Sequence, residues 1–171
     1  MSHGIDSRIV SLTAVRRPCH HGRMQTHAAP AEAGTLERNK DIVRRFVAEI
    51  FVAGRPEAVD ELVAVDFVPH SWPSTGDGRG DLKRAIERVG DGLADPEFSV
   101  EDLIAEGDRV AARLTTSATH VGEFMGMPAT NKRYTIEEIH IFRLRDGQVV
   151  EHWHQFNPLA LMQQLGVKPP A

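Results

Sequence analysis

Acidic and imidazole side chains recur at every second position in two neighbouring segments near the C-terminus. Glu138 and His140 lie in the first segment, and His152 and His154 lie in the second. Alternate residues of a β-strand face the same side, so a hairpin would place these four side chains on one face. Burying ionisable groups among apolar neighbours costs free energy unless the groups are paired, so such groups often mark a functional site. The spacing therefore predicts a chemical site on this hairpin.

A carboxylate beside imidazoles suits acid–base chemistry. Removing a proton next to a carbonyl group needs a base whose pKa lies near the working pH and which reaches the carbon. We predict His154 as that base and Glu138 as the residue that orients it. His140 or His120 would donate a hydrogen bond to the enolate oxygen as its charge develops. Burial lowers the pKa of a histidine and a nearby carboxylate raises it, so the two effects can poise such a cluster near neutrality.

The same residues could instead bind a metal ion, because histidine nitrogens and carboxylates are zinc ligands. Residues two apart on a strand are separated by about 7 Å, however, which does not favour a tight tetrahedral site. We predict neither a metal nor an organic cofactor.

Aromatic, histidine and methionine side chains near the hairpin are expected to line a pocket. His70 and Trp72 would close its mouth from a loop, and His152 could instead be solvated at a sheet edge. If the pocket only binds its ligand, the same residues would line it without catalysis. The predicted substrate-binding residues are His70, Trp72, His120, Met125, Tyr134, Phe142, His152 and Phe156.

The turn between the two segments decides which residues face each other. We predict a three-residue loop, Arg145-Asp146-Gly147, with glycine in the left-handed conformation. This register places Glu138 opposite His154 and His140 opposite His152. A two-residue Asp-Gly loop would shift the register by one and place His140 opposite Trp153.

The rest of the chain must hold this hairpin in place. Apolar residues at helical spacing predict a helix capped by Thr35 and ended at Gly54, a second from Pro56, and a third carrying Leu82 and Ile86. The loop before the third helix contains Gly76, Gly78 and Gly80. Long alternating strands follow, and a short helix starts at Pro158. Helices followed by antiparallel strands predict an α+β fold over residues 35–168, with residues 1–34 as a disordered tail.

Composition narrows the function classes. The 171 residues carry a net charge of −4, so no general basic field points to nucleic acid. No apolar run reaches the roughly 20 residues of a membrane helix. Cys19 is the only cysteine, which rules out an internal disulfide and suggests the cytoplasm. We expect no nucleic acid and no membrane as partners.

Four segments resemble a known family: His120 to Thr130, Ile139 to Arg143, Asp146 to His154, and Leu161 to Gly166. They are similar to the SnoaL-like polyketide cyclases, or ester cyclases, of the nuclear transport factor 2-like superfamily. The resemblance implies a cone-shaped, curved antiparallel sheet closed by about three N-terminal helices, and an apolar pocket that needs no cofactor.

The resemblance also implies a reaction, the intramolecular aldol condensation of a polyketide ester. The family uses a histidine on the first hairpin strand, which aligns with His140, and an aspartate directly after the tryptophan. His154 stands at that aspartate position, so this chain departs from the family where the acid/base group lies.

The resulting expectation is a cofactor-free enzyme that acts on a small hydrophobic carbonyl compound by cyclisation or isomerisation. The alternative is a non-catalytic pocket protein that binds a hydrophobic metabolite. A third reading makes the outward sheet face, with Ile139, Ile141 and Trp153, the functional surface. That face is apolar enough to predict a homodimer under all three.

Overall fold

The computed structural model describes residues 30–168, and the side chains from Glu32 onward. The first helix begins at Pro30, before the predicted cap at Thr35. Residues 1–29 of the predicted tail, with Cys19, lie outside the described residues. The helical elements are α1 (Pro30–Phe46), η1 (Val47–Val52, a π-helix), α2 (Glu57–Leu62), α3 (Gly78–Gly92) and α4 (Pro158–Leu165). The strands are β1 (Val63–Pro69), β2 (Leu93–Glu106), β3 (Arg109–His120), β4 (Arg133–Arg145) and β5 (Gln148–Phe156).

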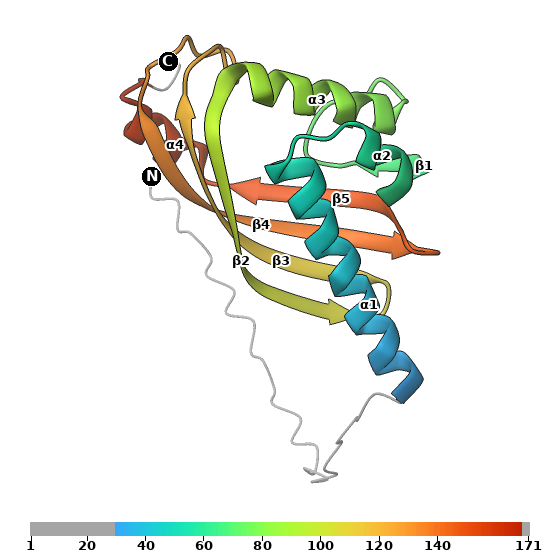
Figure 1. Cartoon of the computed structure of the whole chain (residues 1–171). Coiled ribbons are helices and arrows are strands. Elements are labelled where there is room, and N and C mark those ends of the chain that lie inside the picture. The colour runs from blue at the N-terminus through green and yellow to red at the C-terminus, as the bar shows by residue number, and fades with distance from the viewer. Residues whose placement is uncertain (1–29, 169–171) are drawn as a thin grey trace, which may run out of the picture.

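The strands form one curved sheet in the order β1-β5-β4-β3-β2, and α1 crosses one face of it (Figure 1). The predicted α+β fold is confirmed. The sheet is mixed, however, and not antiparallel throughout as the prediction implied. β1 pairs in parallel with β5, with Pro69 opposite His152. The last strand of the chain is therefore an interior strand. His152 is not at a sheet edge, and it is buried at 1% exposure.

The register of the β4–β5 hairpin also differs from the prediction. Asp146 and Gly147 both adopt left-handed backbone angles (φ 52° and 82°), as in a two-residue type I′ turn. Val150 is then an extra residue in β5, because Leu144 pairs with Val149 and Arg143 with Glu151. His140 consequently faces His154, and Glu138 faces Phe156. The bulge restores the expected parity, so the four predicted side chains do share the inner face.

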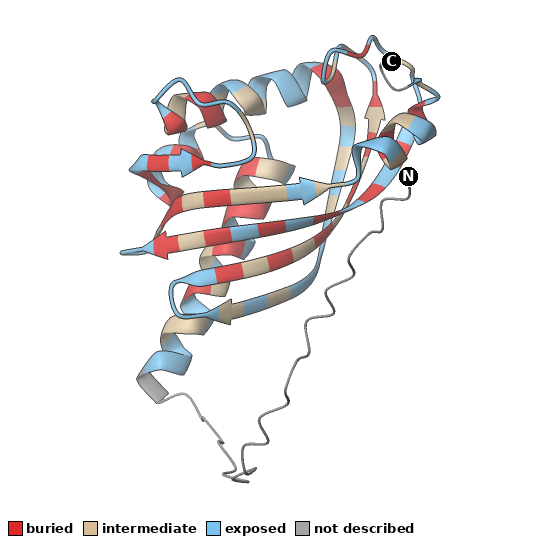
Figure 2. Ribbon diagram, turned by 180° about the vertical axis from the view of Figure 1, so that it is seen from behind, coloured by how far each residue is buried: buried red, intermediate tan, exposed pale blue. Residues whose placement is uncertain are grey.

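Alternation of buried and exposed residues along the strands gives the sheet one covered and one open face (Figure 2). On the covered face, α1, η1, α2 and α3 contribute to one apolar cluster that includes Phe46, Val59 and Phe142. Helix α4 closes the other end with Leu161 and Leu165, which pack in a cluster with Tyr134. Within residues 30–168, no helix combines the length and apolarity needed to cross a membrane.

Helix α3 begins inside the segment that was predicted as a glycine loop. Asp77 caps it by accepting a hydrogen bond from the backbone N–H of Gly80. Gly78 lies so close to β1 that a Cβ atom there would sit 2.0 Å from the backbone oxygen of Phe67. This close approach, and not flexibility, explains the glycine at position 78.

Replacing Gly78 by alanine should therefore destabilise the protein. We expect a loss of about 1–3 kcal/mol in the free energy of unfolding, since backbone and not a flexible side chain blocks the new methyl group. Gly90, in the same helix, has open space at its Cβ position. Gly90→Ala should be neutral or stabilise by roughly 0.5–1 kcal/mol. Urea unfolding of both variants checks this, and equal effects would contradict the close-packing argument.

Candidate active site

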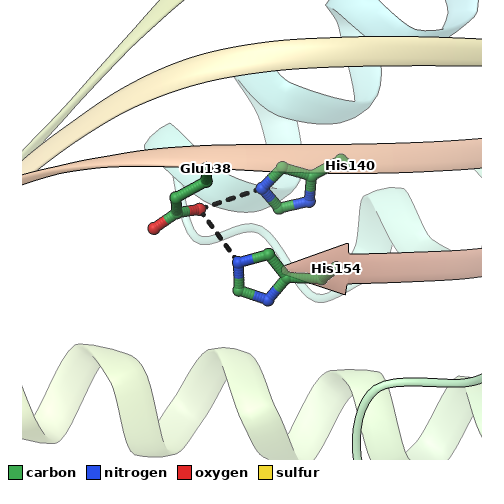
Figure 3. A group of neighbouring side chains, drawn as sticks. All are labelled: Glu138, His140 and His154. Atoms are coloured by element: carbon green, nitrogen blue, oxygen red, sulfur yellow. Dashed lines mark hydrogen bonds and ion pairs between the residues drawn. The ribbon is translucent and has the colours of Figure 1, made fainter. Parts of the chain in front are cut away.

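Two strands bring the three predicted catalytic residues together. Glu138 and His140 come from β4 and His154 from β5 (Figure 3). Nε2 of His140 lies 2.9 Å from Oε2 of Glu138. Nε2 of His154 lies 3.3 Å from the same oxygen, an ion-pair distance. The two imidazoles stack, with ring centroids 4.3 Å apart.

Glu138 is a buried carboxylate with 8% exposure. Burial raises the pKa of its carboxyl, but the hydrogen bond from His140 and the contact with His154 outweigh this effect and hold that pKa at about 2. Glu138 is therefore ionised at neutral pH and can only accept hydrogen bonds. Two imidazoles, and not solvent, stabilise its charge.

A second hydrogen bond extends the cluster into the core. Nδ1 of His140 lies 2.9 Å from Nε2 of His152. Burial lowers the pKa of His140, and it lowers the pKa of His152 further, so both imidazoles are neutral. Because Glu138 accepts, Nε2 of His140 must donate to it. Nδ1 of His140 then accepts from Nε2 of His152, which leaves Nδ1 of His152 without a hydrogen.

A cavity of about 600 Å³ borders this cluster, and an outer hollow of about 710 Å³ adjoins it. The two share Trp72, Tyr134, Glu138 and His154. The side chain of His154 is 22% exposed, whereas His140 is almost fully buried. His154 is therefore the imidazole of the pair that a ligand reaches most easily. The predicted site residues that line one or both spaces are Trp72, Met125, Tyr134, Glu138, His140, His152, His154 and Phe156.

Three predicted binding residues do not line these spaces. His70 lies with Trp153, on whose ring it stacks at 4.4 Å, and its Nε2 pairs with Glu151 at 2.8 Å. Its predicted place at the pocket mouth was wrong, because odd-numbered residues of β5 point away from His152 and His154. Phe142 is fully buried in the core against Phe46.

His120 is fully buried as well, and its Nδ1 lies 3.1 Å from the hydroxyl oxygen of Thr130. It sits at the end of β3 and does not border the cavity or the outer hollow. The prediction that it donates to the enolate oxygen, or lies at the pocket rim, does not fit this place. Thr116 and Ala118 of β3 line the cavity, and His120 lies beyond it at the end of the same strand.

Two residues near the site were missed. Thr116 faces the cavity, and its hydroxyl is buried without a hydrogen-bond partner in the part of the chain that the structure describes. The available signal was a polar residue between Leu114 and Ala118 in the inward row of β3. Ser71 Oγ accepts the backbone N–H of His154 at 2.6 Å and so fixes the end of β5. Nothing in the sequence distinguishes Ser71 from an ordinary loop serine.

The same cluster must be tested as a metal site. Glu138, His140 and His154 each offer a ligand atom, and these atoms lie within 4.8 Å of one another. Zinc binds histidine nitrogen at about 2.0–2.1 Å along the lone pair, which lies in the ring plane. The rings of His140 and His154 are stacked and inclined by only 12°, so an ion in one ring plane lies well outside the other. This arrangement fits an acid–base cluster better than a metal site.

The neutral imidazoles make stability depend on pH. The folded-state pKa values of His140 and His152 lie below the ordinary 6.5. As the pH falls through 6.5, the unfolded chain therefore binds protons at these histidines that the folded chain does not bind. The free energy of unfolding should therefore fall between pH 7.5 and 5.5, by up to about 1.4 kcal/mol per pH unit for each histidine. His152→Gln removes one titrating group and keeps a donor for His140. Urea titrations should show a shallower pH dependence in this variant; an unchanged slope would contradict the assignment.

Comparisons with known proteins agree with the fold. The family model of the SnoaL-like polyketide cyclases matches residues 41–165. The chain is 30% identical over 131 residues to an aklanonic acid methyl ester cyclase of Streptomyces peucetius, covering 74% of this chain and 89% of the relative. It is 32% identical over 124 residues to a nogalonic acid methyl ester cyclase of Streptomyces nogalater, covering 68% and 89%.

Solved structures show the same fold. The structure of TsrD from Streptomyces laurentii superposes with a TM-score of 0.71 at 29% identity, covering 77% of this chain and 97% of TsrD. A SnoaL-like protein from Jannaschia has the same TM-score at 22% identity, and covers 84% of this chain. The family match covers most of the chain, from α1 to α4, and the chain belongs to the SnoaL-like polyketide cyclase family.

Proposed function

We propose that the protein closes a ring in a small, largely apolar carbonyl compound by acid–base chemistry without a cofactor. The observation that carries this proposal is the ionised carboxylate of Glu138 between two imidazoles in the wall of a cavity. The named substrates of the relatives, aklanonic and nogalonic acid methyl esters, suggest a polyketide ester as substrate class.

His154 is the proposed base. In this proposal neutral His154 holds its proton on Nε2, which lies 3.3 Å from Oε2 of Glu138 without a hydrogen bond in the resting structure, so that Nδ1 is the basic nitrogen. Nδ1 takes a proton from the carbon next to the carbonyl, and Glu138 stabilises the imidazolium that forms. The resulting enolate attacks a second carbonyl carbon of the same molecule, which forms the ring bond. His154 then returns its proton to the new alkoxide, so the aldol addition is balanced.

Tyr134 is the proposed donor to the enolate oxygen. Both nitrogens of His140 are engaged with Glu138 and His152, so His140 has no free N–H for a substrate. Tyr134 borders the cavity, and burial, together with the charge of Glu138, raises the pKa of its hydroxyl to about 12. It therefore remains a neutral donor at neutral pH, as stabilisation of a developing oxyanion requires.

The test is conversion of aklanonic and nogalonic acid methyl esters, followed by product chromatography. His154→Ala should lower kcat by about 10²–10⁴-fold, the usual contribution of a general base. Tyr134→Phe should lower kcat about tenfold or more, since one oxyanion donor is lost. His70→Gln, on the outer face, is the matched control and should be close to the wild type.

Two outcomes would count against the proposal. Full turnover by His154→Ala would remove His154 as the base. If the wild type binds these esters without converting them or related polyketide esters, the cavity is that of a non-catalytic binding protein, the alternative function.

We also propose that the enzyme works in the cytoplasm as a homodimer. The open sheet face presents Ile139, 46% exposed, and Ile141 as apolar residues beside Trp153. Such a face favours self-association. Sedimentation equilibrium should give twice the chain mass, and Ile141→Asp should shift it toward the monomer. A monomeric wild type at micromolar concentration would contradict the dimer.

A further inference from the structure

The cavity is lined by residues with buried polar atoms that have no partner among the described residues, and two of these atoms, on Trp72 and His152, have opposite hydrogen-bonding sense. Nε1 of Trp72 is a donor only, and it is buried without a partner among the described residues. Nδ1 of His152 is likewise buried and unpartnered in that part of the chain. The two rings lie 5.3 Å apart, inclined by 58°, and both residues line the cavity. Rings at this separation can share one bridging oxygen.

The hydrogen-bond chain from Glu138 fixes the sense of the His152 nitrogen. Oε2 of Glu138 accepts from Nε2 of His140, and Nδ1 of His140 accepts from Nε2 of His152. The hydrogen of neutral His152 is therefore on Nε2, and its Nδ1 is an acceptor. Trp72 and His152 thus offer one donor and one acceptor on neighbouring rings, and a single group can satisfy both only if it accepts and donates.

A hydroxyl group has this property, whereas a carbonyl or an ether oxygen can only accept. The surrounding wall is largely apolar and partly aromatic, with the rings of Phe51 and Phe98 5.6 Å apart and inclined by 31°. A buried polar group without a partner destabilises the protein, so both atoms favour a ligand that pairs them. The flat apolar wall suits a hydroxyl carried on an aromatic or enolic ring.

We propose that the inner part of the cavity is a recognition site for a phenolic or enolic hydroxyl of the ligand, held between Trp72 and His152. The hydroxyl oxygen accepts from Nε1 of Trp72, and its hydrogen is donated to Nδ1 of His152. The inference deepens the proposed function and rests on the cavity being the substrate site. Glu138 then acts twice: it supports His154 at one end, and through His140 it sets the acceptor at the other.

The binding test uses 1-naphthol and 1-fluoronaphthalene, which have nearly the same shape but only one of which donates. Calorimetric titration at pH 7 should show 1-naphthol binding about tenfold more tightly, the value of one to two buried hydrogen bonds. Trp72→Phe keeps a ring and deletes the N–H, and should abolish most of this preference. Trp153→Phe changes the chain's other tryptophan, which stacks on His70, and should leave it intact.

A second measurement uses the unmodified binding site, in case Trp72→Phe does not fold. Proton–nitrogen spectra should show the indole N–H signal of Trp72, assigned with Trp153→Phe, shifting with 1-naphthol and not with 1-fluoronaphthalene. Long-range spectra should show His152 with its hydrogen on Nε2. Equal affinities in the wild type, a preference that persists in Trp72→Phe, or hydrogen on Nδ1 of His152 would each overturn the inference.

The two proposals fail separately. His154→Ala should lose turnover and keep the preference for 1-naphthol, which would support both. A naphthol preference in a protein that converts no polyketide ester would leave this recognition site standing and remove the catalytic proposal. Turnover of a polyketide ester without any preference for 1-naphthol would support the catalytic proposal and remove the recognition site.

Discussion

A buried carboxylate is the constraint on which the rest of this structure depends. Glu138 is removed from water, and an ionised carboxyl in that position is stable only with partners. Its partners come from two strands, so β4 and β5 must pair with His140 opposite His154. That pairing depends in turn on the extra residue Val150. A slip of one residue would turn His154 to the outer face and leave the charge of Glu138 half compensated.

The sequence predicted the face of these residues but not their partners. Alternation fixed the side on which Glu138, His140 and His154 lie. The two-residue turn and the bulge each shifted the pairing by one residue, and together they left that side unchanged. The adjacent buried residues Val149 and Val150 break the alternation and were the available signal for the bulge. The turn sequence alone cannot decide the register, because Asp-Gly is compatible with both a two-residue and a three-residue loop.

Contacts between distant segments were beyond the sequence. β1 joins β5 across about 80 residues of chain, and no local pattern in either strand indicates a parallel neighbour. This pairing turned His152 from a solvated edge residue into a fully buried one. The same segment ends in a bend that sends His70 to the outer face and Trp72 to the cavity. Alternation cannot be followed through such a bend, so the two were wrongly grouped.

The difference from the family at position 154 cannot be understood from that position alone. The resemblance implies an aspartate directly after the tryptophan, whereas here the carboxylate of the pair is Glu138 and the imidazole is His154. An aspartate at 154 would stand beside Glu138, and two carboxylates that close cannot both ionise, so one pKa would rise strongly. An imidazole there adds no second negative charge beside Glu138. In the proposed mechanism the two residues act as one acid–base unit, in which the charge of Glu138 favours an imidazole over a carboxylate at position 154.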